Sequence, residues 1–176
     1  MKTQIKASEF EFCIYKDDNV FGDGKHETTK FMLDAIERYG IEGKTVIDVG
    51  TGTGILSVFC AKLGAKHVIA LDIDPHALEW ARKNFKRNNV DVEVEINDLV
   101  RDIDDKADIV LANLPGPLQT ENIKLVDKNL NEDGLFICTW WNKIPFEDFT
   151  FYLNWEVLEH FEGEEYDGYV LKQKAE

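Results

Sequence analysis

The chain has 176 residues and a formal net charge of −14, from 20 lysines and arginines against 34 aspartates and glutamates. This length fits one ordinary domain, and the charge disfavours nucleic acid as a partner unless one face of the protein is locally basic. The same charge would attract a basic protein, although solubility alone also explains it.

The sequence indicates neither a targeting segment nor a metal site. Residues 1–9 lack an apolar signal core and eighteen apolar residues never run together, so we expect a cytoplasmic protein without a membrane span. Cys13, Cys60 and Cys138 stand far apart without the spacing of metal ligands. We therefore expect buried, reduced thiols and no bound metal.

Strand and helix periods alternate along the first half of the chain. Alternating apolar residues predict a strand at 10–14, and helical spacing predicts a helix from Thr29 to Tyr39 that ends at Gly40. The next elements are predicted as strand 44–49, helix 55–63, strand 67–71, helix 75–88 and strand 92–96. Three strand–helix steps of this kind imply a parallel sheet.

The second half adds strand 108–112, helix 118–130, strand 134–140 and a short helix near 145–153. Residues 155–161 and 166–172 then predict an antiparallel hairpin. The fold class is therefore a doubly wound, mostly parallel α/β sheet in one domain, residues 1–176, with its core at 44–176. In such a sheet a ligand binds at the carboxyl ends of the strands.

A glycine-rich turn, Asp48-Val49-Gly50-Thr51-Gly52-Thr53-Gly54, follows the first core strand, where glycines let a ligand approach the backbone. We expect Gly50, Thr51, Gly52 and Gly54 to bind a cofactor. A dinucleotide fingerprint would place its third glycine at position 55, where the chain has Ile55, so NAD is disfavoured. No phosphate-binding P-loop motif occurs either.

Acidic residues follow the next two strands. Asp72 lies 22 residues after Gly50, close to the spacing expected for a carboxylate that binds ribose hydroxyls, and its neighbour Ile73 belongs to the same site. Asp74 precedes a proline and is explained as a helix cap. Asp98 is expected to accept from an adenine amino group, although a plain turn also explains it. Asp48 is expected to anchor an amine through water.

These segments resemble the class I methyltransferases: Val46–Gly54, Ala70–Pro75 and Asn97-Asp98 carry the resemblance, which extends over nearly the whole chain. The resemblance implies S-adenosylmethionine (AdoMet) as cofactor and S-adenosylhomocysteine (SAH) as product. It also implies a seven-stranded sheet whose last two strands are antiparallel.

The segment Phe21-Gly22-Asp23-Gly24-Lys25-His26-Glu27-Thr28-Thr29, here called the flap, resembles the F-G-x-G-x-H-x-T-T motif of the PrmA family, whose members methylate a protein of the large ribosomal subunit. The resemblance implies that Thr29, Gly50, Asp72 and Asn113 contact the cofactor. Thr28 or Thr29 is expected to cap the following helix and to offer a hydroxyl to the ligand. His26 is a candidate to take a proton from a substrate amine, and a hydrogen-bonded structural role is the alternative.

Asn113 follows the fourth core strand and is expected to orient the attacking nitrogen or to hold the cofactor's amine, with an Asn-initiated turn as the alternative. The sequence Asn113-Leu114-Pro115-Gly116 matches neither the N-I-L-A-G-P of PrmA relatives nor the N-P-P-Y of enzymes that methylate planar nitrogens. About twenty residues precede the flap, too few for the N-terminal recognition domain of PrmA. We therefore expect the flap, the Asn113 loop, an aromatic rim at Trp140-Trp141 or another chain to recognise the substrate.

Three functions follow from these patterns. The leading one is AdoMet-dependent methylation of a nitrogen, most plausibly an amine of a basic, ribosomal protein. The second keeps the chemistry and changes the acceptor to an RNA base or a small molecule, because of the N-x-P-like loop after the fourth strand. The third is a cofactor-binding subunit of another methyltransferase, because a recognition domain is missing.

Overall fold

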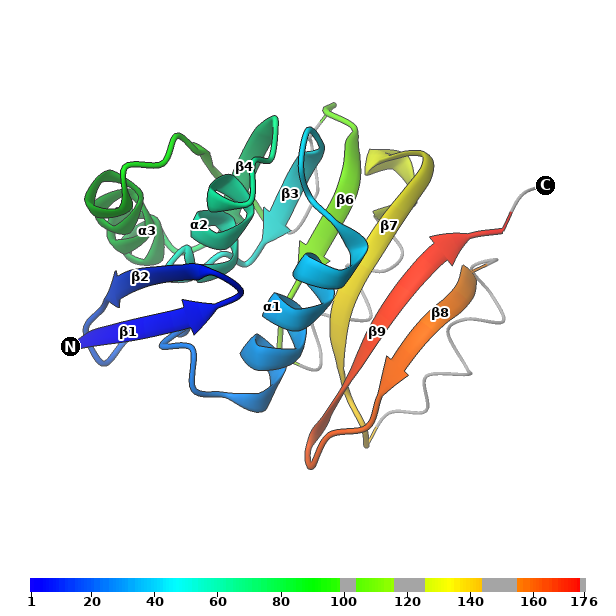
Figure 1. Cartoon of the computed structure of the whole chain (residues 1–176), viewed down its shortest axis with the longest axis horizontal. Coiled ribbons are helices and arrows are strands. Elements are labelled where there is room, and N and C mark those ends of the chain that lie inside the picture. Colours follow the sequence, from blue (N-terminus) through cyan, green and yellow to red (C-terminus); the bar gives the residue numbers. More distant parts are fainter. Residues whose placement is uncertain (99–103, 116–125, 144–154, 175–176) are drawn as a thin grey trace.

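The computed structural model describes residues 1–98, 104–115, 126–143 and 155–174 (Figure 1). Seven strands of this part form one sheet in the order β5-β4-β3-β6-β7-β9-β8. Their bounds are β3 Thr45–Val49, β4 His67–Asp72, β5 Glu93–Ile96, β6 Ala107–Ala112, β7 Leu130–Trp141, β8 Trp155–Phe161 and β9 Tyr166–Gln173. The strands from β5 to β7 are parallel, and β9 runs antiparallel to both β7 and β8. The predicted seven-stranded, mostly parallel sheet with an antiparallel hairpin is confirmed.

Alternate residues of the strands build two apolar clusters, one on each face of the sheet, as the two-residue period of a strand requires. One cluster joins the helices α1 (Glu27–Tyr39) and α2 (Ile55–Lys62) to residues such as Val46, Val68 and Ile109. The cluster on the other face contains the neighbours of those residues, such as Ile47, Ile69 and Val110. Strands buried on both faces read as continuous apolar runs, which is why the core strands were predictable.

Several predicted boundaries differ from the structure. The predicted helix 118–130 lies mostly outside the described residues; its described end is a 3₁₀ turn, Asp127–Asn129, after which Leu130 begins β7. The predicted helix near 145–153 lies outside the described residues altogether. Cys60 and Cys138 are buried as expected, whereas Cys13 is half-buried, and all three are free thiols. In the described part of the chain, no helix is long and apolar enough to cross a membrane.

The first strand of the chain was missed. β1 (Lys2–Ala7) pairs antiparallel with β2 (Phe10–Tyr15) in a separate two-stranded sheet. Only Ile5 of β1 is fully buried, so its mostly polar sequence lacks the apolar alternation that reveals a strand. Figure 1 shows this hairpin in front of the main sheet, beside the helix α3 (Pro75–Asn88).

Two asparagines of α3 fasten the hairpin to the core. The Asn84 side chain accepts from the Tyr15 N–H (2.9 Å) and donates to the carbonyl oxygens of Tyr15 (2.8 Å) and Thr53 (2.9 Å). One turn further along the helix, Asn88 pairs in the same way with the backbone of Cys13. The helix thus supplies through side chains the hydrogen bonds that a neighbouring strand would give to β2. Through Thr53, Asn84 also ties the hairpin to the glycine turn.

Replacing Asn84 by alanine is expected to lower the free energy of unfolding by about 2–3 kcal/mol, because three buried or partly buried backbone groups lose their partner. Chemical denaturation with urea measures this change. Arg82→Ala, on the exposed face of the same helix, is the control and should change the free energy by less than about 0.5 kcal/mol. Equal effects of the two substitutions would contradict the role given to Asn84.

Candidate functional site

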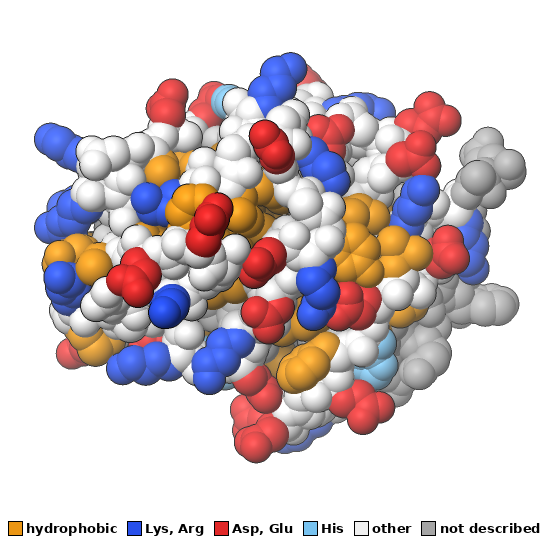
Figure 2. Space-filling view, in the orientation of Figure 1, with side chains coloured by type: hydrophobic (Ala, Val, Ile, Leu, Met, Phe, Trp, Pro, Cys, Tyr) orange, Lys and Arg blue, Asp and Glu red, His pale blue; other side chains and the backbone are white. Residues whose placement is uncertain are grey.

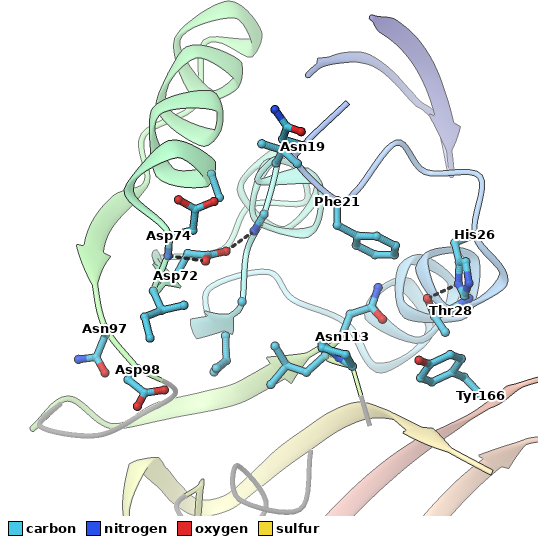
Figure 3. Close-up of a pocket in the computed structure, with 18 residues that line it drawn as sticks. Asn19, Phe21, His26, Thr28, Asp72, Asp74, Asn97, Asp98, Asn113 and Tyr166 are labelled. Atoms are coloured by element: carbon cyan, nitrogen blue, oxygen red, sulfur yellow. Dashed lines mark hydrogen bonds between the residues drawn. The ribbon is translucent and has the colours of Figure 1, made fainter. Parts of the chain in front are cut away.

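A cavity of about 370 Å³ opens where the parallel strands β3, β4 and β6 end. This is the carboxyl edge of the sheet, beside the point where the strand order reverses, and the volume is in the range of small-molecule sites. Eight of the predicted site residues line the cavity: His26, Thr28, Gly50, Gly52, Asp72, Ile73, Asp98 and Asn113. Figure 3 shows Asp72 and Asp98 at one end of the cavity and His26 and Thr28 at the other.

Four predicted site residues lie beside the cavity and do not line it: Thr29, Asp48, Thr51 and Gly54. All four are buried behind its wall. Ten further lining residues were not named as site residues from the sequence, although Phe21 belongs to the expected flap and Leu114 and Pro115 to the expected Asn113 loop; the ten are Asn19, Val20, Phe21, Val49, Asp74, Ala77, Asn97, Leu114, Pro115 and Tyr166. Four of these, Val49, Asp74, Asn97 and Leu114, directly adjoin a predicted site residue in the sequence, and the other six do not.

The glycine turn has the backbone that its sequence predicts. Gly50, Gly52 and Gly54 all have positive φ, at 69°, 54° and 80°. A Cβ on Gly50 would lie 2.2 Å from a methyl group of Leu114, and a Cβ on Gly52 would lie 2.7 Å from the carbonyl oxygen of Phe21. The turn is therefore closely covered by two segments that themselves line the cavity, and a side chain at either glycine would displace one of them.

Asp48 supports this turn from beneath. Its side chain is 1% exposed, and one carboxylate oxygen accepts from the hydroxyls of Thr51 (2.7 Å) and Ser57 (2.6 Å). Burial raises the pKa of the Asp48 carboxyl, and the two hydroxyl donors offset part of the rise. The carboxylate thus has a structural role in holding Thr51, whereas its contact with a cofactor amine stays a prediction.

A titration can test the burial of Asp48. The pKa of Asp48 is higher in the folded chain than in the unfolded one. Ionisation of Asp48 therefore lowers the free energy of unfolding as the pH rises from about the ordinary pKa of 3.8 through the raised pKa. Asp48→Asn does not titrate and keeps an oxygen for the hydroxyls. We expect the stability of this variant relative to wild type to increase with pH across that window, measured by urea unfolding. A difference that stays flat or falls would contradict the assignment; Asp34→Asn, an exposed acid of α1, is the control.

Asp72 is held in place by backbone donors. Its two carboxylate oxygens accept from the N–H groups of Gly52 (2.9 Å) and Asp74 (3.0 Å), and each oxygen has a further lone pair. Asp74 caps α3 by accepting from the His76 N–H (2.9 Å), which confirms the role predicted for it. The carboxylate of Asp72 is therefore fixed at the cavity wall, with acceptor capacity left for ligand hydroxyls.

The flap is attached to the glycine turn through Thr53, whose hydroxyl donates to the Gly22 carbonyl (2.6 Å) and whose N–H donates to the Phe21 carbonyl (3.1 Å). Phe21 lines the cavity, although 56% of the residue is exposed. The first residues of the flap thus lie over the turn and place an aromatic ring at the cavity.

The expected cap of α1 is wrong. His26, and neither Thr28 nor Thr29, caps this helix: its Nδ1 accepts from the Thr28 N–H (3.3 Å) and lies 2.8 Å from the Thr28 hydroxyl. The reason is that His26 has an extended backbone while both threonines already lie within the helix. The structure thus gives His26 the structural role considered as the alternative. An Nδ1 that accepts a hydrogen bond is not free to take a substrate proton, so catalysis by His26 stays a prediction.

Asn113, directly after β6, has an oriented side chain. Its amide oxygen accepts from the Thr139 hydroxyl (3.1 Å) of β7, which holds the side chain in place. Figure 3 shows Asn113 between the acidic end of the cavity and the aromatic end formed by Phe21, His26 and Tyr166. Asn113 therefore lies in the middle of the cavity, where groups bound at its two ends would meet.

The expected aromatic rim at Trp140 and Trp141 is replaced by other residues. Trp140 is 1% exposed in the core and Trp141 is half-buried; neither is among the residues that line the cavity. Tyr166, at the start of β9, lines it instead, with its ring centroid 6.0 Å from that of His26. No sequence signal distinguished Tyr166, because only the pairing of β9 with β7 brings this residue near the flap.

The cavity has features that suit AdoMet. The fixed Asp72 carboxylate suits ribose hydroxyls, and Asn97 and Asp98 offer further polar groups beside it. Ile73 is 64% exposed although it is apolar, which gives a flat ring such as adenine a surface to cover. The turn at Gly50 and Gly52 lets a ligand approach the backbone closely. No cluster of metal-ligating side chains occurs among residues 1–98, 104–115, 126–143 and 155–174.

Comparison with known proteins identifies the family. The family model of ribosomal protein L11 methyltransferases (PrmA) matches residues 9–139. A ribosomal protein L11 methyltransferase of Thermosipho africanus is 36% identical over 154 residues, which are 86% of this chain and 57% of that protein. A relative with the same description from Clostridium perfringens is 46% identical over 120 residues, 68% of this chain and 38% of that protein. The chain thus spans about half the length of these curated relatives.

A solved structure that matches this chain over nearly its whole length supports the same family. The crystal structure of a ribosomal protein L11 methylase from Lactobacillus delbrueckii subsp. bulgaricus superimposes with a TM-score of 0.87 at 28% identity, over 98% of this chain and 100% of that one. The family model covers well over half of the sequence, including the flap and the glycine turn. The chain belongs to the ribosomal protein L11 methyltransferase (PrmA) family.

Proposed function

We propose that the chain transfers the methyl group of AdoMet to an amine of a basic protein, with ribosomal protein L11 as the acceptor. The observation that carries the proposal is that Asp72 and Asn113 line one cavity, from the ends of β4 and β6, beneath the flap. Family membership supports the reaction, and the names of the relatives support the acceptor. Modification of a ribosomal protein would place the chain in the cytoplasm.

The acidic end of the cavity would hold the cofactor. Asp72 would bind the ribose hydroxyls, Ile73 would pack against the adenine and Asp98 would accept from its amino group. The backbone at Gly50 and Gly52 would lie along the rest of the molecule, and Thr28, at the opposite end, would offer its hydroxyl to the part of the cofactor that reaches the acceptor. Thr29, Thr51 and Gly54 would act from behind the cavity wall, by holding the helix and the turn in place.

The aromatic end would bind the acceptor amine. AdoMet would supply a methyl group that is already activated by positive sulfur, so the protein mainly has to align the acceptor nitrogen with it. The amine would lose a proton to solvent, its nitrogen would bond to the methyl carbon as the carbon–sulfur bond breaks, and SAH would leave. The oxygen of Asn113, oriented by Thr139, would accept a hydrogen bond from the amine and direct the nitrogen lone pair towards the cofactor. The flap and Leu114 would cover the site from two sides.

The net charge of −14 would favour encounter with a basic acceptor. Figure 2 shows acidic side chains spread among basic ones on the face it presents, so on this face the attraction would not come from one acidic patch. The charge also disfavours RNA as the acceptor, although an RNA base remains the alternative that a labelling experiment can detect.

Transfer of label tests the proposal. The protein is incubated with methyl-labelled AdoMet and a cell extract, which is then separated into protein, RNA and small molecules before counting. We expect label in a basic protein band and loss of that label with Asp72→Ala. Label in RNA or metabolites alone would refute the protein acceptor. Label that appears only after a second protein is added would favour a partner subunit of another methyltransferase.

A further inference from the structure

We propose that Tyr166 determines which acceptor fits the aromatic end of the cavity, and that Glu27 is the residue that positions it. The inference rests on the proposed methyl transfer. It concerns residues that the family motif of the flap leaves open, because Glu27 occupies an unspecified position of that motif and Tyr166 lies outside it.

Glu27, in the first turn of α1, holds the turn that precedes Tyr166. One oxygen of its carboxylate accepts from the N–H of Glu164 (3.2 Å) and the other from the N–H of Glu165 (3.3 Å). These two bonds lower the pKa of the Glu27 carboxyl, with the bond to Glu164 as the largest cause. The carboxylate thus binds two successive amides of the hairpin and is ionised at neutral pH.

The opposite side of the same turn is held by Asn142, which follows β7. Its N–H donates to the Glu165 carbonyl (3.1 Å) and its side-chain amide donates to the Glu164 carbonyl (3.1 Å). The backbone N–H and carbonyl groups of Glu164 and Glu165 thus all have hydrogen-bond partners. The turn is fixed between α1 and the end of β7.

Gly163 shows how closely the turn is packed. A Cβ at this position would lie 2.0 Å from the Tyr166 carbonyl oxygen and 3.1 Å from a carboxylate oxygen of Glu27. The Gly163 N–H donates to the side chain of Asp167 (3.3 Å). Only a residue without a side chain therefore lets the hairpin close against Glu27 with Tyr166 in its observed place.

This arrangement sets Tyr166 at the acceptor end. Figure 3 shows its hydroxyl pointing into the cavity on the side of Asn113, with the rings of His26 and Phe21 nearby. The His26 ring lies between the other two, with its centroid 5.8 Å from that of Phe21 and 6.0 Å from that of Tyr166. A phenol in this position limits the width of the cavity, attracts a cationic side chain through its ring and offers a hydroxyl for a hydrogen bond.

Tyr166 lines the end of the cavity opposite Asp72, and Glu27 holds the turn that precedes it, so changes at both residues should affect the acceptor and leave the cofactor unchanged. Tyr166→Ala is expected to raise the KM for ribosomal protein L11 by about tenfold or more, and Glu27→Ala is expected to do the same by displacing Tyr166. The affinity for SAH should change less than about twofold in both variants, measured by calorimetry. Glu27→Gln, which keeps one acceptor oxygen, should recover part of the loss.

A double-mutant cycle separates positioning from a general loss of stability. If Glu27 acts through Tyr166, the double variant Glu27→Ala/Tyr166→Ala should have the KM of Tyr166→Ala alone. Hydrogen exchange at the amides of 164 and 165 should accelerate in Glu27→Ala. Glu165→Gln removes a charge from the same turn but keeps the backbone N–H that Glu27 binds, so it should leave both readouts near wild type.

The outcomes distinguish the two proposals. A wild-type protein that transfers no methyl group to ribosomal protein L11 overturns the proposed function, and this inference with it. Normal transfer together with an unchanged acceptor KM in Tyr166→Ala and Glu27→Ala overturns this inference alone. Additive effects of the two substitutions would also overturn it, because Glu27 would then act independently of Tyr166.

Discussion

Replacing Asp72 by alanine is expected to weaken binding of SAH by about a hundredfold or more. A hydrogen bond to a charged acceptor contributes about 1.5–3 kcal/mol, and two ribose hydroxyls would lose such bonds together. The sum corresponds to a factor of about 10² to 10⁴ in the dissociation constant. The substitution also releases the N–H groups of Gly52 and Asp74, so the glycine turn loses a support. Calorimetric titration of the folded variant with SAH measures the effect.

The control for this prediction is Asp34→Ala, which removes an equal charge from the exposed face of α1, outside the cavity. It should leave the affinity for SAH near wild type. Asp72→Asn should fall between the two, because its amide keeps one acceptor oxygen. An Asp72→Ala variant that is folded and binds SAH with wild-type affinity would show that the ribose lies elsewhere.

Replacing Gly52 by alanine is expected to cost about 2–4 kcal/mol of stability and most of the cofactor affinity. A non-glycine residue at a φ of 54° costs about 1–2 kcal/mol. The added Cβ would also lie 2.7 Å from the Phe21 carbonyl oxygen, and this backbone atom can move only if the flap moves. The Gly52 N–H that supports Asp72 would shift as well. Thermal unfolding and titration with SAH measure the two losses.

Gly43→Ala separates the strain of the backbone from the collision. Gly43 has a φ of 72°, but a Cβ there would meet no atom within 4 Å. This variant should lose only about 1–2 kcal/mol of stability and bind SAH normally. Equal losses of stability in the two variants would mean that the flap does not cover Gly52 as the structure shows.

Local patterns sufficed for the parts of the fold that neighbouring residues dictate. Core strands such as Thr45–Val49 are buried on both faces, Gly40 ends α1, and Asp74 with Pro75 begins α3. Because each depends on a few adjacent residues, each could be predicted from the sequence. Asp72 was likewise found by its spacing from the glycine turn, and its place at the cavity agrees with that prediction.

Features that depend on tertiary contacts could not be predicted. β1 is held by its partner β2, which two asparagines of α3 bind. Tyr166 reaches the cavity through a hairpin that Glu27 holds, more than a hundred residues away in the sequence. The cap of α1 depends on the ring orientation of His26, which residue type alone does not reveal. In each case the feature depends on a residue of another element or on the orientation of a side chain.

The most direct test of the proposed function is methyl transfer to purified ribosomal protein L11. The protein and AdoMet are incubated with this acceptor, and the mass of the intact acceptor is measured before and after the reaction. The account predicts an increase by one or more methyl groups, absent when Asp72→Ala replaces the wild type. Tight binding of AdoMet without any increase in the acceptor's mass would contradict it, because the cavity would then serve another acceptor.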